Sequence, residues 1–431
     1  MLPWLAIGLA GIGLTVELPL ALILIARLPD AKTQIAAFGG LAYVCAMMAV
    51  APASMLVMLG TVRSIEGHRF HRMFAFTGAI SGVLALVFAI IVFSPLFDLL
   101  ATRLLNLPPE TIEPARLAGQ ILVPLVVMDS IRFLFQGVAV QCGHELWLDI
   151  GTGLRVAGVI LALLVGWYLV ESGMVHATGS AVAACAILFG ATVHFTHAII
   201  RKMQVQRSVR ASGQSNVIAT PEPWRSLISF YMPLSMVSLI EILWDVAILI
   251  FIMRMQNPIN NLAAWSIAQC IAWLPVCAAL GFSSIVGRTH NQNENRRQMI
   301  IFALRIGLLL SLLLVVIALP PLDGKILKDL MGLDLGCYQL AQSALWLMAP
   351  WPLIAIFTAF LQGCMIRLNR QSALMEAMIV GVLTLLTTLG IGVYNGNFQS
   401  SQIAAFATTF SALAEMLWLA GRFRFTKAQQ D

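Results

Sequence analysis

Twelve apolar segments, each long enough to cross a lipid bilayer, constrain the fold of this chain more than any other feature of its sequence. A spanning helix needs about 20 apolar residues, and windows of that length fall at approximately 4–28, 36–62, 73–96, 117–140, 149–171, 175–200, 226–253, 261–286, 299–319, 341–365, 371–393 and 400–421. The segments are continuously apolar and rich in Leu, Ala and Ile, whereas the strands of a membrane barrel alternate over about ten residues. The sequence therefore predicts an all-α polytopic membrane protein with about 12 transmembrane helices.

The composition excludes a soluble protein. Of the 431 residues, 59% are hydrophobic and only 11% are charged, and the mean hydropathy is +0.88. A soluble globular domain of this size carries about 25% charged residues to remain in solution. We expect an integral membrane protein.

Lys and Arg set the predicted orientation. With both termini in the cytoplasm, 16 of them lie on the inner side, 7 on the outer side and 3 within spans, which accounts for all 26. An excess of basic residues on the cytoplasmic side is typical of membrane proteins. We therefore expect cytoplasmic termini, a bacterial inner membrane and a first span that is retained rather than cleaved as a signal peptide. The basic pI reports this topology, and we expect no nucleic-acid partner.

The longest polar stretch, 201–225, divides the spans six and six. It predicts three regions: an N-terminal six-helix bundle at 1–200, a cytoplasmic linker at 201–225, and a C-terminal six-helix bundle with a short tail at 226–431. The second and eighth spans begin alike, and mid-span prolines follow at Pro52 and Pro275. The offset between the two similar starts is 227 residues. Two bundles of the same topology are a common plan for secondary transporters, with the substrate held between them.

Three acidic residues lie near the middle of predicted spans, Glu17 in the first and Glu241 with Asp245 in the seventh. A charged residue at the centre of a spanning helix costs roughly 2.5–3.5 kcal/mol, so its presence indicates a cavity, a partner or a bound substrate. The offset of 227 places Glu17 one residue from Asp245. Glu241 and Asp245 share a helix face, where two carboxylates share a proton or bind a cation. Packing of these acids against neighbouring helices is the alternative.

Pro19 follows Glu17 and leaves the carbonyl of Thr15 without its helical partner. The freed carbonyl and the carboxylate together suit a proton, Na⁺ or a substrate amine. We expect Pro19, Pro52 and Pro275 to kink their spans and to serve as gating points.

Asp129 and Arg132, spaced i,i+3 in the fourth span, can neutralise one another, and they are also candidates for a substrate or ion site. The remaining charged residues in spans are given structural roles. Arg155, Arg305 and Glu376 lie near the cytoplasmic ends, where snorkelling explains them, and Glu415 lies deeper and alone. His194 and His197 share a face without a nearby Cys, Asp or Glu, which makes a poor metal site.

The sequence contains no phosphate-binding Gly-rich loop, zinc-protease helix or nucleophile elbow. We therefore expect no enzyme, no cofactor and no metal. The cysteines indicate packing rather than disulfides, and Cys337 alone falls outside the spans. The expected partners are a small-molecule substrate, a coupling ion and the bilayer, around a monomer.

The outer segment Lys325–Asp334 reads KILKDLMGLD, and it resembles a Lys-Ile-Leu-x-Asp-x-x-Gly-x-Asp stretch of the ANK (progressive ankylosis) family. Phe38–Tyr43, Pro124 with Asp129, and Ser229–Leu234 resemble that family in the same order, and Glu17 matches an acidic residue of its first span. The resemblance implies a fold similar to the MATE and polysaccharide-flippase (MOP) superfamily, two six-helix bundles in a V, and a role in exporting small molecules. Animal members are associated with pyrophosphate, ATP and citrate.

The residues favour a secondary exporter of a small polar molecule that works by alternating access, coupled to H⁺ or Na⁺. One alternative is the efflux of pyrophosphate or citrate as in the animal relatives, although Glu241 and Asp245 form an acidic wall that repels a polyanion. A second is a lipid-linked oligosaccharide flippase, which needs arginines facing a diphosphate and finds only Arg132 and Arg155. A membrane-embedded enzyme or scaffold is the third.

Overall fold

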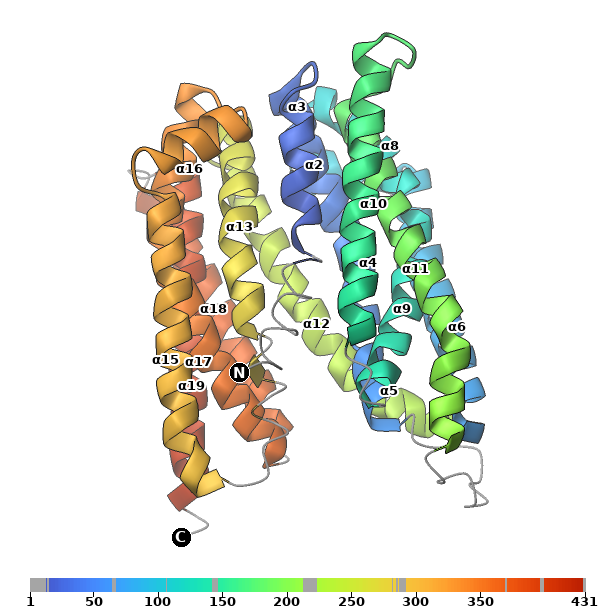
Figure 1. Ribbon diagram of the computed structural model, residues 1–431. Helices are drawn as coiled ribbons and strands as arrows, with labels where there is room; N and C mark the ends of the chain where they lie inside the picture. Colours follow the sequence, from blue (N-terminus) through green and yellow to red (C-terminus); the bar gives the residue numbers. More distant parts are fainter. Residues whose placement is uncertain are drawn as a thin grey trace. The chain divides into compact units, whose positions relative to one another are not determined.

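Helices make up the part of the chain that the computed structural model describes, and no strand occurs in it (Figure 1). The described residues are 13, 15–63, 67–105, 107–141, 146–211, 223–280, 282, 283, 286, 292–368, 370–395 and 399–428. The predicted fold class, an all-α polytopic membrane protein, is confirmed.

Ten helical stretches within the described residues are long and apolar enough to span a membrane. An eleventh is formed by α8 (Pro109–Ile121) and α9 (Val123–Gln141), which meet at a bend of 43°. These eleven coincide with the second to twelfth predicted spans. The first predicted span, 4–28, falls largely outside the described residues, which contain α2 (Glu17–Ile25) from it.

Contacts between helices divide the chain into two compact units. We call Leu28–Val246 the N-terminal unit, and Met1–Arg27 together with Ala247–Asp431 the C-terminal unit. This grouping follows packing, whereas the predicted domains 1–200, 201–225 and 226–431 follow the repeat. Packing assigns α2 to the C-terminal unit and most of α12 (Trp224–Met253) to the N-terminal unit. The predicted domain boundaries stay a prediction.

The N-terminal unit is built around α9, which packs mainly against α4, α5, α6 and α11 and also contacts α8 and α10. Besides α8, α9 and α12, the unit contains α3 (Ala31–Ala37), η1 (Phe38–Ala42), α4 (Tyr43–Ser54), α5 (Leu56–Arg63), α6 (Gly67–Phe93), α7 (Leu96–Leu99), η2 (Leu100–Leu104), α10 (Leu146–Glu171) and α11 (Gly179–Ala211). The η segments are π-helical turns. Its core packs Leu59 and Met73 against Leu134, Phe76 and Tyr231. Helices α10 and α11 lie side by side.

The C-terminal unit is built around α13 (Pro258–Leu280), which is buried along most of its length and packs against α16, α17 and α19. Its other helices are α15 (Gln292–Ile317), η4 (Gly324–Leu330), α16 (Leu335–Met348), α17 (Trp351–Arg367), α18 (Gln371–Asn395) and α19 (Ser400–Ala428). By contrast, α15 exposes Leu308, Leu309, Leu312 and Leu313. Such a continuous apolar surface suits contact with lipid.

The first part of the outer segment with the ANK-like sequence, Lys325–Leu330, is helical, whereas Gly332–Asp334 are not. It forms η4, and Asp323 at the start of η4 accepts hydrogen bonds from the Gly324 amide (2.6 Å), the Tyr338 hydroxyl (2.5 Å) and the Gln342 side chain (2.5 Å). Cys337, expected outside the spans, is fully buried in α16. The buried carboxylate of Asp323 thus fixes this segment against α16. Hydropathy alone does not predict this contact.

Local backbone features repeat between the two units at the predicted offset of 227. Asp30 and Asn257 are the two non-glycine residues with positive φ among the described residues, at 56° and 49°. Asp30 directly precedes α3, and Asn257 directly precedes α13. The side-chain oxygen of Gln34 accepts the Ser180 amide of α11 at 3.2 Å, and that of Asn261 accepts the Ser401 amide of α19 at 3.1 Å. In each unit, therefore, the side-chain oxygen of an amide residue caps the N-terminus of a long helix, Gln34 that of α11 and Asn261 that of α19.

We expect Gln34→Leu and Asn261→Leu each to destabilise the protein, because each removes the acceptor of a buried helix N-terminus. The loss for Gln34 is about 1 kcal/mol, a typical value for a lost cap. Asn261 also donates to the carbonyls of Gln256 and Asn257, so its loss is larger. Thermal unfolding in detergent measures both, and the exposed Gln399, which precedes α19, provides the control Gln399→Leu. A double variant no less stable than either single one would contradict independent caps in separate units.

Candidate functional site

Glu17 is the first residue of α2 and is 1% exposed. Helix α2 packs against α13 within the C-terminal unit, where the Thr15 side chain hydrogen-bonds Cys277. A carboxylate at a helix N-terminus interacts favourably with the helix dipole. Pro19 lies in the same first turn, where a missing amide hydrogen leaves no helical bond unmade. Val16, just before α2, keeps helical backbone angles (φ −68°, ψ −16°), and its carbonyl accepts the Leu20 amide at 3.1 Å.

Glu241 and Asp245 lie in the part of α12 that belongs to the N-terminal unit. The side chain of Glu241 is exposed, and Asp245 is partly buried with an interaction partner. Their spacing of four residues places them on one face of the helix, as predicted. Glu17 belongs to the other unit.

The two mid-span prolines differ in their effect on the helix. Pro52 lies inside α4, which ends two residues later at Ser54, and the Pro52 carbonyl accepts the hydroxyl of Tyr231 at 2.9 Å. Pro275 lies inside α13, which continues through it to Leu280. The gating role of all three prolines stays a prediction.

Asp129 and Arg132 form a buried ion pair, and Arg155 completes it. Asp129 Oδ1 accepts from Arg132 Nε at 2.9 Å and from Arg155 Nη1 at 2.5 Å, and no side chain of the three is more than 5% exposed. The snorkelling interpretation of Arg155 is wrong, because this side chain is buried and its guanidinium binds Asp129 of α9. Helix α10 also packs closely on α11. A Cβ on Gly190 of α11 would lie 2.8 Å from the Arg155 carbonyl. No pattern along the chain connects residues 129 and 155.

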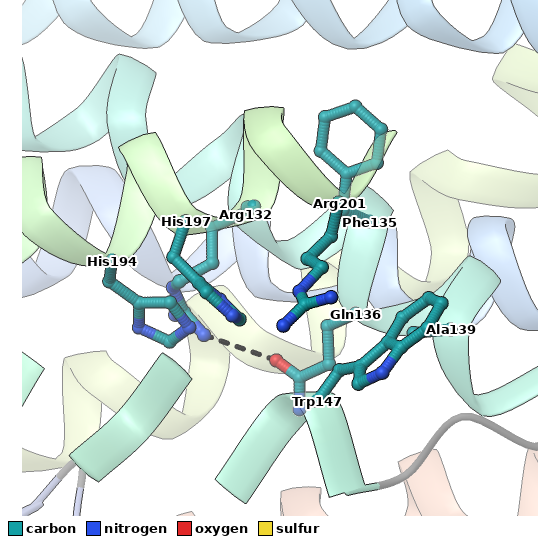
Figure 2. Close-up of a pocket in the computed structure, with 9 residues that line it drawn as sticks. Arg132, Phe135, Gln136, Ala139, Trp147, His194, His197 and Arg201 are labelled. Atoms are coloured by element: carbon teal, nitrogen blue, oxygen red, sulfur yellow. Dashed lines mark hydrogen bonds between the residues drawn. The ribbon is translucent and has the colours of Figure 1, made fainter. Parts of the chain in front are cut away.

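A small pocket lies next to this ion pair, between α9, α10 and α11 (Figure 2). The volume that the centre of a water molecule can occupy in this pocket is about 30 Å³. Figure 2 shows polar side chains and Trp147 around it. The nine described lining residues are Arg132, Phe135, Gln136, Ala139, Trp147, His194, His197, Ala198 and Arg201.

Polar side chains of the pocket contact one another and the aromatic ring of Trp147. Arg132 Nη1 donates to Gln136 Oε1 at 3.1 Å, and the Arg201 guanidinium lies 5.5 Å from the centre of the Trp147 ring. The two histidines, predicted to form a poor metal site, lie together here. Among the described residues, no three His, Cys, Asp or Glu side chains are grouped as a metal site requires.

Two further acids have partners that the sequence did not reveal. Glu415, predicted to be alone, accepts from Gln362 Nε2 at 3.4 Å. Glu376 pairs with Arg422, whose Nε lies 2.7 Å from Glu376 Oε2. Both contacts join α19 to its neighbours in the C-terminal unit.

The fold matches solved membrane transporters along nearly the whole chain. A eukaryotic MATE transporter aligns with a TM-score of 0.69 and 14% identity over 98% of this chain and 94% of its own. The chain has the fold of the MATE transporters. A MOP superfamily transporter from Pyrococcus furiosus aligns with a TM-score of 0.68 and 14% identity over 99% and 96%. The lipid II flippase MurJ aligns with a TM-score of 0.60 and 13% identity over 96% and 87%.

Neither a protein-family profile nor a curated protein sequence matches the chain. The structural neighbours have the fold that the ANK resemblance implied, and membership of the ANK family stays a prediction.

Proposed function

We propose that this protein is a secondary active exporter of a small polar molecule, working by alternating access and coupled to H⁺ or Na⁺. The observation that carries the proposal is Glu17, a carboxylate 1% exposed at the start of a helix in a chain with a transporter fold. An acid buried in a membrane protein is costly unless an ion, a proton or a partner relieves it. Glu17 lies at the start of α2, near Pro19. In this proposal, the surroundings of its carboxylate change when α2 moves.

In this proposal Glu17 and the Glu241/Asp245 pair bind the proton, the coupling ion or a positive group of the substrate. The repeated features of the two units support a duplicated transporter in which each half contributes one acidic group. Asp129 and Arg132 have a different role. Because Asp129 already binds Arg132 and Arg155, this triad fixes α9 to α10, and it does not supply a free charge to cargo.

The flippase alternative requires arginines that face a diphosphate. The similarity to MurJ favours this alternative, with a TM-score of 0.60. Arg132 and Arg155, the two candidates, both bind Asp129, and this weakens it. The second alternative, efflux of polyanions, is weakened because the exposed carboxylate of Glu241 would repel such a substrate.

The test compares metabolites released by cells that lack the protein, cells that produce it, and cells that produce Glu241→Gln/Asp245→Asn. We expect a small polar compound to accumulate outside the producing cells and to fall to the background level with the double variant. Uptake of that compound into inside-out vesicles should then require a proton or sodium gradient. Identical exometabolomes of the three strains, with equal protein levels in the membrane, would contradict the proposal.

A further inference from the structure

A stripe of hydrogen-bonding side chains runs along α13. Its members recur at every fourth residue, and side chains four residues apart lie above one another on a helix. They are Asn261, Trp265, Gln269, Trp273 and Cys277. We call these five residues the α13 stripe, which is about 24 Å long at 1.5 Å per residue. Because four residues slightly exceed one helical turn, the stripe winds slowly around α13.

The corresponding positions of the N-terminal unit are apolar beyond the first one. The offset of 227 pairs Asn261 with Gln34, and it pairs the other four residues of the α13 stripe with Phe38, Ala42, Ala46 and Val50. Each of these four is at most 5% exposed. Apolar side chains therefore satisfy the packing at these positions. The polar ones occur in the unit that contains α2 and Glu17, which indicates a role beyond packing.

One end of the α13 stripe faces α19, where buried polar atoms lack partners. Asn261 accepts the Ser401 amide, and Trp265 follows one turn later on the same face of α13. Trp265 is 1% exposed, and its Nε1 has no hydrogen-bond partner in the part of the chain that the structure describes. The same is true there of the side-chain hydroxyls of Ser400, Ser401 and Thr408 in α19, all of them buried.

The matched helix α11 is less polar at these positions. Its capped first-turn serine and that of α19 set an offset of 221, which aligns SAVAACAI of α11 with SQIAAFAT of α19. Thr408 then matches Ile187, and Ser400 matches Gly179. Buried polar atoms are normally paired with protein groups or with ordered water. Water can accept from an indole and bond to hydroxyls, so it is the ligand that this interface suits.

The other end of the α13 stripe reaches α2. The thiol of Cys277 is hydrogen-bonded to the side chains of Thr15 and Trp273. Thr15 lies two residues before Glu17, and α2 packs against α13. Exposure increases in this direction along the stripe, up to 38% for Trp273. Helix α13 contributes thiols but no carboxyl group and no basic side chain, so Glu17 is the acid to which the stripe leads.

We propose that the α13 stripe and the facing residues of α19 bind a row of water molecules through which a proton reaches Glu17. The inference rests on the proposed function, and it names the proton as the coupling ion. The indole and amide groups hold the water in place. Each water molecule, and the Thr15 hydroxyl, accepts one proton and releases another. The path begins in bulk water at the Asn261 end, and it ends when the Glu17 carboxylate becomes the neutral acid.

The first test asks whether water lies beside Trp265. Hydroxyl radicals made from water by a brief X-ray pulse oxidise side chains that contact water, and mass spectrometry of the full-length protein gives the rate at each residue. We expect Trp265 to be oxidised within threefold of the rate of the exposed Trp273. The equally buried Phe38, its match in the other unit, should react at least tenfold more slowly after correction for intrinsic reactivity. Protection of Trp265 to the level of Phe38 would overturn the proposal.

The second test asks whether this path delivers the proton. After a rapid drop in pH, the infrared band of protonated carboxyl groups follows proton uptake by the full-length protein in proteoliposomes. The part of the band that is lost in Glu17→Gln belongs to Glu17. We expect Trp265→Phe/Thr408→Val to slow the rise of the Glu17 band at least tenfold without changing its final amplitude. Thr77→Val, which removes an equally buried hydroxyl without a partner from α6, should leave the rate unchanged.

The outcomes separate this inference from the proposed function. A Glu17 band that rises at the wild-type rate in the double variant, or is slowed equally by Thr77→Val, would refute the path and leave the proposed function standing. A wild-type protein in which Glu17 takes up no proton would refute proton coupling at Glu17, and the path with it. If the double variant does not fold, oxidation of Trp265 in the wild-type protein still decides whether the path holds water.

Discussion

Glu17→Gln is expected to abolish gradient-driven transport in proteoliposomes while leaving the protein folded. Glutamine keeps the size and the hydrogen-bonding capacity of glutamate, but it cannot bind and release a proton or balance the charge of Na⁺. Because one charge moved through 100 mV supplies about 2.3 kcal/mol, the loss of one coupling proton removes enough energy to prevent accumulation against a modest gradient. The measurement is the initial rate of substrate uptake with an imposed pH or sodium gradient.

The matched control for this experiment is Glu376→Gln. Glu376 is another glutamate in a spanning helix of the same unit, but it pairs with Arg422 and is partly exposed. We expect this variant to transport at the wild-type rate. Wild-type flux through Glu17→Gln would remove Glu17 from the mechanism, and equal losses in the two variants would indicate damage to folding rather than to coupling.

Asp129→Asn is expected to cost about 3–5 kcal/mol of stability, the usual effect of removing one partner from a buried ion pair. The substitution leaves Arg132 and Arg155 buried near each other without their shared counter-charge. Both guanidinium groups then repel each other in a largely buried site. Unfolding in detergent, followed by tryptophan fluorescence, measures the loss.

The triple variant Asp129→Leu/Arg132→Met/Arg155→Met separates charge from packing. Since replacing a whole buried ion network with apolar side chains is often neutral, we expect it to recover most of the stability lost in Asp129→Asn. A triple variant as unstable as the single one would show that shape, rather than charge balance, makes Asp129 important. Wild-type stability of Asp129→Asn would contradict a buried network.

The sequence predicted the spans well because hydropathy is a local property. Eleven of the twelve predicted spans coincide with described helical spans, and the offset of 227 aligns Asp30 with Asn257 and Gln34 with Asn261. The partners of buried charges were predicted less well. The contact of Asp129 with Arg132 follows from helical spacing, whereas its contact with Arg155 depends on how α10 is rotated against α9.

The shared face of His194 and His197 follows from their spacing in the sequence. That Arg132, Gln136 and Trp147 line one pocket with them could not be predicted, because it depends on how three helices approach one another.

The sequence by itself determined that this protein is a helical membrane protein and where eleven of its spans lie, and it predicted a duplication. Those properties depend on the runs of apolar residues along the chain, because the length and hydropathy of each segment decide whether that segment can span a bilayer. Only the tertiary structure decided that α2 packs with α13, that Arg155 turns inward to Asp129, and that Glu415 has a partner. Such pairings depend on the rotation and close approach of neighbouring helices, and these are set by packing among residues far apart in the chain.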